Sequence, residues 1–166
     1  MLKRVYYSAY IPVNNDKNLP SIITKPPLLR EHRLYQADWL LRFYDFSWDE
    51  IVTEEFPNLD EDLDPKTFWA LNNLKYFPME INTVPKEELL RIPGIGARGV
   101  MKILSARRFK RLTFDDLEKL KISIKKAKFF ITCNKEFQRQ VPFYRENLKL
   151  ALIKPEPKKL IQAIAF

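Results

Sequence analysis

The chain of 166 residues is poor in three residue types, because it has only 1 cysteine, 1 histidine and 3 glycines. A lone cysteine, Cys133, excludes an intrachain disulfide and a cysteine-rich metal or cluster site, and it fits a reducing cytoplasm. His32 has no second histidine and no nearby cysteine, so we expect it on a helix face or interface and not as a metal ligand. No run is long and apolar enough to span a bilayer, which predicts no membrane contact.

Basic side chains are scarce in one region of the chain, and acidic side chains are scarce in another. Residues 31–65 hold 11 acidic and 2 basic side chains, whereas residues 97–154 hold 16 basic and 5 acidic ones. The net charge of +8 therefore sits on the second half of the chain, which predicts a polyanionic partner for that half. For the acidic half a solvated face is the favoured interpretation, with a basic protein surface as the alternative.

The N-terminal half predicts one strand followed by helices. Residues 1–13 are rich in β-branched and aromatic side chains that interrupt the apolar run, which favours a strand over a signal peptide. Residues 28–44 carry two apolar stripes, as in a helix that is buried all round or docks on another chain. Ser47 and Asp64-Pro65 have the residue types of helix starts, and residues 145–153 predict a short helix before an apolar tail.

The glycines lie together, between residues 94 and 99. Helical patterns at 85–91 and 101–108 flank them, which predicts a helix, a tight turn and a second helix. Glycine allows positive φ and close approach of a ligand, and a helix that begins at such a turn aims its N–H groups at an anion. The predicted phosphate-binding residues are Pro93, Gly94, Ile95, Gly96, Ala97, Arg98, Gly99, Lys102, Arg107 and Arg108.

This pattern resembles the helix-hairpin-helix motif of DNA repair and competence proteins, which grips one DNA strand by its phosphates without reading bases. The likeness covers about residues 81–134, because a weaker copy follows at 116–131. Its turn, residues 121–124, has no glycine, so we expect it to support the fold. Its matched positions are Leu117, Leu120 and Ala127, in the places of Leu89, Ile92 and Gly99. The motif also implies a monovalent cation on the carbonyls of Ile92 and Ile95, and a turn used only for packing is the alternative.

A wider likeness runs from Arg4 to Cys133. Several distinctive runs in order are similar to the C-terminal part of the bacterial radical SAM family linked to DNA modification and repair, namely residues 4–13, 26–44, 63–71 and 77–82. In that family these segments follow a radical SAM barrel. The three-cysteine loop that holds its iron–sulfur cluster is missing here, so the cluster and SAM are expected only in a full-length relative.

Other candidate sites have a structural interpretation that we favour. The position of a glycosylase hairpin lysine is taken by Arg98, which cannot form a Schiff base, and Asp116 fits the capping box of Thr113. The acidic cluster Asp60, Glu61, Asp62 and Asp64 lacks the glycine and final glutamate of a calcium loop, so we expect a turn and a helix cap. The basic run 107–111 exceeds what one helix end needs, which favours DNA backbone contacts.

These patterns predict a mainly α-helical protein with a short N-terminal β-strand. The expected parts are a strand and arm (1–26), a helical connector (27–78), a tandem helix-hairpin-helix domain (79–134) and a helical tail (135–166). The expected function is sequence-nonspecific DNA binding in repair or modification, without catalysis by this chain alone. Two alternatives stay open: a subunit that completes a radical SAM barrel or serves a DNA glycosylase, whether as a separate chain or a truncated product, and a structural scaffold.

Overall fold

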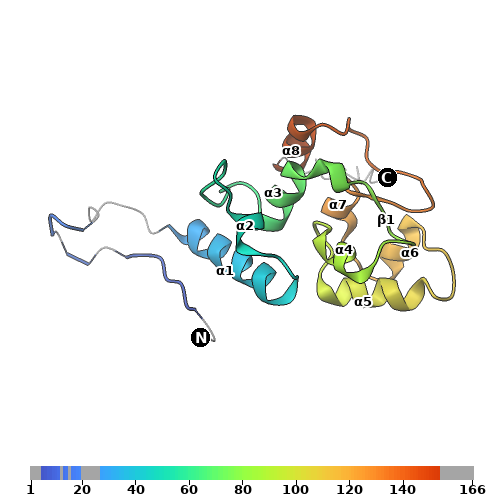
Figure 1. Cartoon of the computed structure of the whole chain (residues 1–166), viewed down its shortest axis with the longest axis horizontal. Coiled ribbons are helices and arrows are strands. Elements are labelled where there is room, and N and C mark those ends of the chain that lie inside the picture. Colours follow the sequence, from blue (N-terminus) through green and yellow to red (C-terminus); the bar gives the residue numbers. More distant parts are fainter. Residues whose placement is uncertain (1–4, 12, 15, 20–26, 154–166) are drawn as a thin grey trace, which may run out of the picture.

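The computed structural model describes residues 5–11, 13, 14, 16–19 and 27–153. Helices dominate this part of the chain, as predicted, and the strands are two residues long (Figure 1). The predicted apolar tail, residues 154–166, lies outside the described residues. The elements in chain order are α1 (Leu28–Phe43), α2 (Trp48–Ile51), α3 (Pro65–Asn72), η1 (Leu74–Tyr76), β1 (Met79–Glu80), α4 (Lys86–Arg91), α5 (Ala97–Ala106), α6 (Phe114–Lys119), α7 (Ile124–Ala127), β2 (Ile131–Thr132) and α8 (Arg145–Ile153).

The N-terminal strand prediction is wrong for the residues that the structure describes, because residues 5–11 form no strand. A side chain of α1 takes the place of a partner strand. The Tyr35 hydroxyl accepts a hydrogen bond from the Tyr7 N–H at 3.1 Å and donates one to the Tyr7 carbonyl at 2.9 Å. Glu31 accepts a third bond from the Ala9 N–H at 2.8 Å. The arm is thus held by single side chains rather than by a ladder.

The helix predicted at 28–44 forms as α1, but only Leu40 on it is buried. Several large apolar side chains of α1 stay in contact with solvent, which excludes the interpretation of a helix buried all round. The exposed ones are Leu28, Leu29, Trp39, Leu41 and Phe43. Docking on another chain remains the alternative that this surface fits.

The predicted helix starts in the connector are confirmed. The Ser47 N–H donates to Glu50 at 3.0 Å in the capping box of α2. The Asp64 side chain accepts from the Thr67 N–H at 3.0 Å, and Pro65 is the first residue of α3. Two local signals therefore fix where α2 and α3 begin.

The two short strands close the hairpin region. β1 and β2 pair in parallel, with Met79 opposite Ile131 and Glu80 opposite Thr132. The Met79 N–H donates to the Phe130 carbonyl at 2.9 Å, and the Ile81 N–H donates to the Thr132 carbonyl at 3.0 Å. Both hairpins lie in the chain between these strands (Figure 1).

One hydrophobic core joins the connector to the hairpins. The ring of Phe77 packs edge to face on Trp69 of α3 on one side and on Phe130 on the other. Arg91, at the end of α4, donates to Glu50 at 3.2 Å and lies over the Trp69 ring. The predicted helix at 145–153 is confirmed as α8, which packs against α3 and buries Leu148 completely.

Candidate nucleic-acid interface

The predicted helix, glycine turn and second helix are present at residues 86–106. α4 ends at Arg91, and the Ile95 N–H donates to the Ile92 carbonyl at 3.2 Å to close the turn. Gly94 lies at φ +82°, in the left-handed region. Gly96 is the N-cap of α5, with φ −93° and ψ 170°. The turn therefore has one position at which the backbone conformation favours glycine.

The three glycines have different reasons to be glycine. A Cβ on Gly94 would lie 3.3 Å from the Ala127 nitrogen and 3.3 Å from the Lys126 Cβ, so α7 approaches this residue closely. A Cβ on Gly99 would lie 3.4 Å from a methyl group of Ile95. Gly96 has negative φ, and its Cβ would meet only the Tyr44 hydroxyl, at 3.4 Å. Gly94 is the essential glycine of the turn.

The N-terminus of α5 offers free donors. Among the described residues, the N–H groups of Gly96, Ala97 and Arg98 have no backbone or side-chain acceptor, and Ala97 and Arg98 are exposed. Such N–H groups carry the positive end of the helix dipole. The side chains of Pro93 and Ile95 are buried under the turn, so neither is available to contact a ligand.

The arginine and lysine residues predicted to bind phosphate differ in whether their side chains already make contacts within the protein. Arg98 and Arg108 are exposed and make no ion pair with another described residue. The exposed Lys102 donates to the Leu120 carbonyl at 2.7 Å, which ties α5 to the end of α6. Arg107 is half-buried and donates to the carbonyls of Ile81 and Val84, at 3.1 Å and 2.6 Å. Through these two hydrogen bonds its guanidinium holds the loop before α4 in place. Arg107 therefore stabilises the fold and is less available to bind a phosphate.

The second hairpin is one residue shorter than the first, which corrects the predicted alignment. Gly94 lies two residues before the N-cap Gly96, and Lys121, at φ +56°, lies two residues before the N-cap Ser123. The second helices therefore align with an offset of 27 and not 28 residues. Lys126, rather than Ala127, stands in the place of Gly99.

A buried lysine reaches the turn from the connector. Lys66 of α3 is only 8% exposed, and its Nζ donates to the Ile95 carbonyl at 2.7 Å. The ammonium also lies 4.7 Å from the centre of the Tyr44 ring. Burial lowers the Lys66 pKa to about 7, against the opposing charge of Asp64. Lys66 lines a pocket of about 580 Å³ together with Tyr44, Asp64, Gly94 and Gly96.

The implied monovalent cation does not fit this arrangement. Of the two predicted carbonyls, Ile95 already accepts from the Lys66 ammonium and Ile92 accepts from the Ile95 N–H. A second positive charge at the Ile95 carbonyl would face the ammonium directly. Within the described residues, Lys66 places a positive charge at the Ile95 carbonyl when it is protonated, below its pKa of about 7.

Asp64 joins the connector to the second hairpin. Lys126 of α7 donates to it at 2.6 Å. Although burial raises the Asp64 pKa, the hydrogen bonds from Lys126 and Thr67 hold it below its usual value. Both hairpins are thus anchored to the first turn of α3, one through Lys66 and the other through Asp64.

The structural interpretations of the other acidic residues are consistent with the observed contacts. Asp116 accepts from the Thr113 N–H at 3.0 Å, and Lys110 donates to it at 2.6 Å. The hydrogen bond from Lys110 is the main reason that the Asp116 pKa falls to about 2. Asp60 accepts from two backbone N–H groups of its own loop. No group of metal-binding side chains occurs among the described residues, and His32 is exposed on α1.

The sequence reasoning missed two features of this region. The link from Lys66 to Ile95 joins residues far apart in the chain, and no local pattern signals it. Phe109 is 88% exposed at the end of α5, although its place inside the basic run 107–111 was visible in the sequence. An aromatic side chain among cations is a composition typical of nucleic-acid surfaces.

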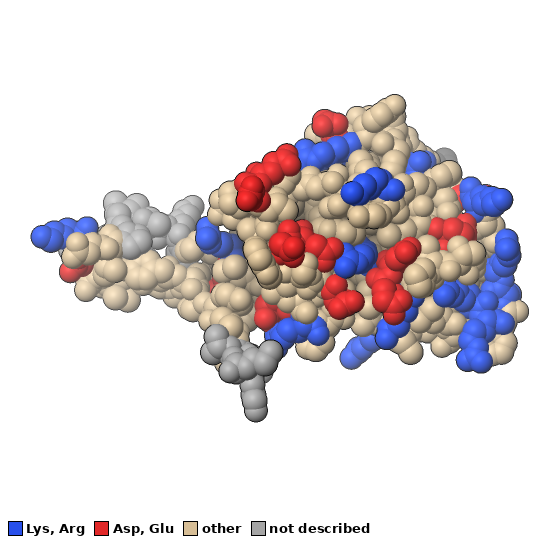
Figure 2. Space-filling view, viewed as in Figure 1, with Lys and Arg blue, Asp and Glu red and all other residues tan. Residues whose placement is uncertain are grey.

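Charge is segregated on the molecular surface. In the face shown in Figure 2, Lys and Arg gather at the end of the molecule occupied by α5 and α6, while Asp and Glu lie nearer the centre. The exposed cations that follow the C-terminal end of α5 include Arg108 and Arg111. Arg98 adds a separate exposed cation at the other end of α5, beside the glycine turn.

Comparison of the chain with protein-family models, with curated proteins and with solved structures found no match. The likeness to the helix-hairpin-helix motif and to the radical SAM family therefore stays a prediction from the residues. Across the described residues, every helix is too short or too polar to traverse a lipid bilayer.

Proposed function

We propose that this chain is a sequence-nonspecific DNA-binding module that acts in DNA repair or modification in the cytoplasm. One observation carries the proposal. The glycine turn leaves the N–H groups of Gly96, Ala97 and Arg98 without acceptors among the described residues, beside a free guanidinium. Backbone donors at a helix N-terminus together with arginine fit a phosphate.

The chemistry of these donors favours the DNA backbone over the bases. Backbone N–H groups have the same geometry whatever base follows the phosphate, so they position a strand without reading it. Exposed Arg98, Arg108 and Arg111 add positive charge along and beyond α5. Binding of this kind depends on counterion release and carries little sequence preference.

Lys66 supports the same function from behind the turn. Its amine donates to the Ile95 carbonyl, and below its pKa of about 7 it adds a positive charge beneath the N–H groups. A tethered ammonium needs no ion from solution. We therefore expect that replacing potassium by sodium or lithium at equal ionic strength leaves DNA affinity unchanged.

A second function is favoured by the surface of α1. Its exposed apolar residues, with Tyr10 and Ile11 of the arm, offer a surface for another protein. Such a partner would be a radical SAM barrel or a DNA glycosylase to which this chain delivers DNA. The scaffold interpretation instead predicts no DNA binding at all.

Salt dependence tests the proposal. We expect the full chain to bind duplexes of unrelated sequence with equal affinity, and log K to fall with log salt at about 0.9 per phosphate, for about four to six phosphates. Fluorescence anisotropy of labelled duplexes measures both. An affinity that does not change with salt, or no binding at low salt, contradicts the proposal and favours the scaffold.

A matched pair of variants locates the interface. Arg98→Ala removes a cation at the turn, and Lys75→Ala removes an exposed cation on η1, whose contact is with the Tyr76 ring. Only Arg98→Ala is expected to lower affinity and to reduce the salt slope. Equal losses in the two variants would show that general charge, and not the hairpin, binds DNA.

A further inference from the structure

Phe109 stands out among the apolar side chains of the described residues, because 88% of its surface is in solvent. Its N–H donates to the Ala106 carbonyl at 3.1 Å, in the turn that follows α5. A ring this exposed contributes little to packing among the described residues.

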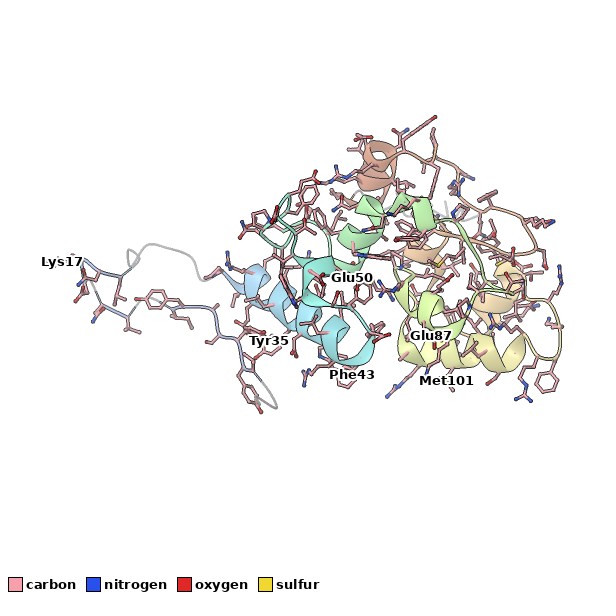
Figure 3. All side chains as sticks on the ribbon, viewed as in Figure 1. Lys17, Tyr35, Phe43, Glu50, Glu87 and Met101 are labelled. Atoms are coloured by element: carbon pink, nitrogen blue, oxygen red, sulfur yellow. The ribbon has the colours of Figure 1, made fainter. Side chains whose placement is uncertain are left out.

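Phe109 belongs to a surface on one side of α5. Met101 and Ser105 lie four residues apart on one face of α5, and Phe109, in the turn after the helix, lines the same hollow as both. Together with Lys102, Ala106 and Leu120 they line a shallow hollow of about 400 Å³. Met101 is 55% exposed and is labelled along the lower edge of α5 in Figure 3. We call this surface the α5 stripe.

The α5 stripe is apolar in the middle and positive around it. Arg108 and Arg111 next to Phe109 are exposed, and neither pairs with another described residue. Arg98 lies at the opposite end of the same helix, beside the glycine turn. The charge pattern matches a polyanion that also carries flat apolar groups, which describes a nucleic-acid strand with its bases turned toward the protein.

Distances along α5 fit one strand. The 10 residues of α5 span about 15 Å at 1.5 Å per residue. Phosphates along one strand of duplex DNA advance by about 3.4 Å each, so the length of α5 alone corresponds to about four nucleotides, and Phe109 lies beyond its end. A strand that ran along α5 from a phosphate at the turn would pass over the α5 stripe.

We infer that Phe109 is a stacking platform for unpaired DNA bases, so that the protein prefers single-stranded DNA or gapped duplexes over intact ones. This inference rests on the proposed function and adds the class of DNA that is bound. In an intact duplex the faces of the bases are covered by their neighbours, and a single projecting ring has nothing to stack on. An unpaired base offers its whole face to the ring.

The experiment compares three labelled probes with the full chain at one salt concentration: a single-stranded oligonucleotide, the same sequence as a duplex, and a strand of abasic sugar-phosphate units. Phe109→Ala is expected to lower affinity for the single strand about tenfold and to leave the other two within twofold. Phe109→Trp keeps the preference for the single strand. Trp48→Ala, which removes an exposed aromatic residue from α2, is the control and changes none of the three.

The outcomes separate this inference from the proposed function. If wild type binds none of the probes, the proposed function fails. If wild type binds all three but Phe109→Ala changes no affinity, or changes all three equally, the stacking platform is overturned and DNA binding stands. Binding to anionic phospholipid vesicles that is lost in Phe109→Ala, with binding to all three DNA probes unaltered, overturns it in favour of a membrane surface.

Discussion

The two hairpins share one plan but solve the left-handed position differently. In the first, Gly94 occupies it, and α7 lies against the place where a side chain would begin. In the second, Lys121 takes the same conformation at φ +56° with its side chain exposed. The turn alone therefore does not demand glycine. Glycine is required only where the turn is also pressed against another part of the protein.

The largest expected effect comes from the same substitution at these two positions. Gly94→Ala is expected to cost about 2–3 kcal/mol, because it combines the left-handed conformation with a close contact to α7. Lys121→Ala is expected to change the free energy of unfolding by less than about 0.5 kcal/mol. Urea unfolding followed by tryptophan fluorescence measures both. Equal costs would refute the distinction between the two turns.

The buried lysine behind the first hairpin predicts a pH effect. The Lys66 pKa is about 7 in the folded protein against an ordinary 10.5, so above pH 7 the unfolded chain binds more protons and stability rises with pH. The expected gain is about 2 kcal/mol between pH 7 and about 8.5.

Two methionine variants check the source of that gain. Lys66→Met should remove the rise between pH 7 and about 8.5. Lys102→Met is the matched control, since Lys102 also donates to a carbonyl but is exposed, and it should keep the rise. The measurement is the free energy of unfolding in urea at several pH values, compared between the two variants and the unchanged protein. A rise that persists in Lys66→Met would assign it to another group.

The next largest expected effect is a difference in DNA affinity between variants of the two hairpins. Arg98 and Lys125 occupy equivalent positions, each two residues after an N-cap and each exposed. Arg98→Ala is expected to weaken duplex binding about five- to tenfold, whereas Lys125→Ala stays within twofold, because α7 has only four residues and a weak dipole. Anisotropy titrations at low salt measure both. A larger loss in Lys125→Ala would move the interface to the second hairpin.

The smallest effect concerns the two N-caps. Gly96→Ser keeps the backbone, because Gly96 has negative φ, and its hydroxyl bonds to the N–H groups of α5. We expect stability to rise by a few tenths of a kcal/mol while DNA affinity falls, since the hydroxyl competes with phosphate. Ser123→Gly should change stability less, because the Ser123 side chain makes no cap hydrogen bond to α7, and should leave affinity unchanged. Thermal unfolding and anisotropy are the measurements, and tighter DNA binding by Gly96→Ser would count against phosphate contact at this helix end.

Local signals carried the predictions that are confirmed. Asp64-Pro65, Thr113 and the glycine turn each determine a helix boundary through atoms only a few residues apart, so the sequence contains the whole interaction. The N-terminal strand failed because a strand needs a partner, and here the hydroxyl of Tyr35 replaces it.

Other features depend on contacts that the sequence does not show. Lys66 looks like an ordinary polar residue in the first turn of α3, and only the folded chain places it under Ile95. The one-residue difference between the hairpins was hidden because the fully buried Leu89 of α4 and Leu117 of α6 match at an offset of 28 residues. The left-handed Lys121 reveals the shorter turn, and no residue type marks that conformation in advance.

The parallel pairing of β1 and β2 has a mechanical consequence. A pull on the chain before Met79 and after Thr132 draws the two strands in opposite directions, so the bonds from Met79 to Phe130 and from Ile81 to Thr132 are loaded in shear at the same time. Tension applied to the chain on either side of the strands would therefore load this two-strand joint. The hairpins lie in the chain between the two strands, so they would carry that tension only after the joint gave way.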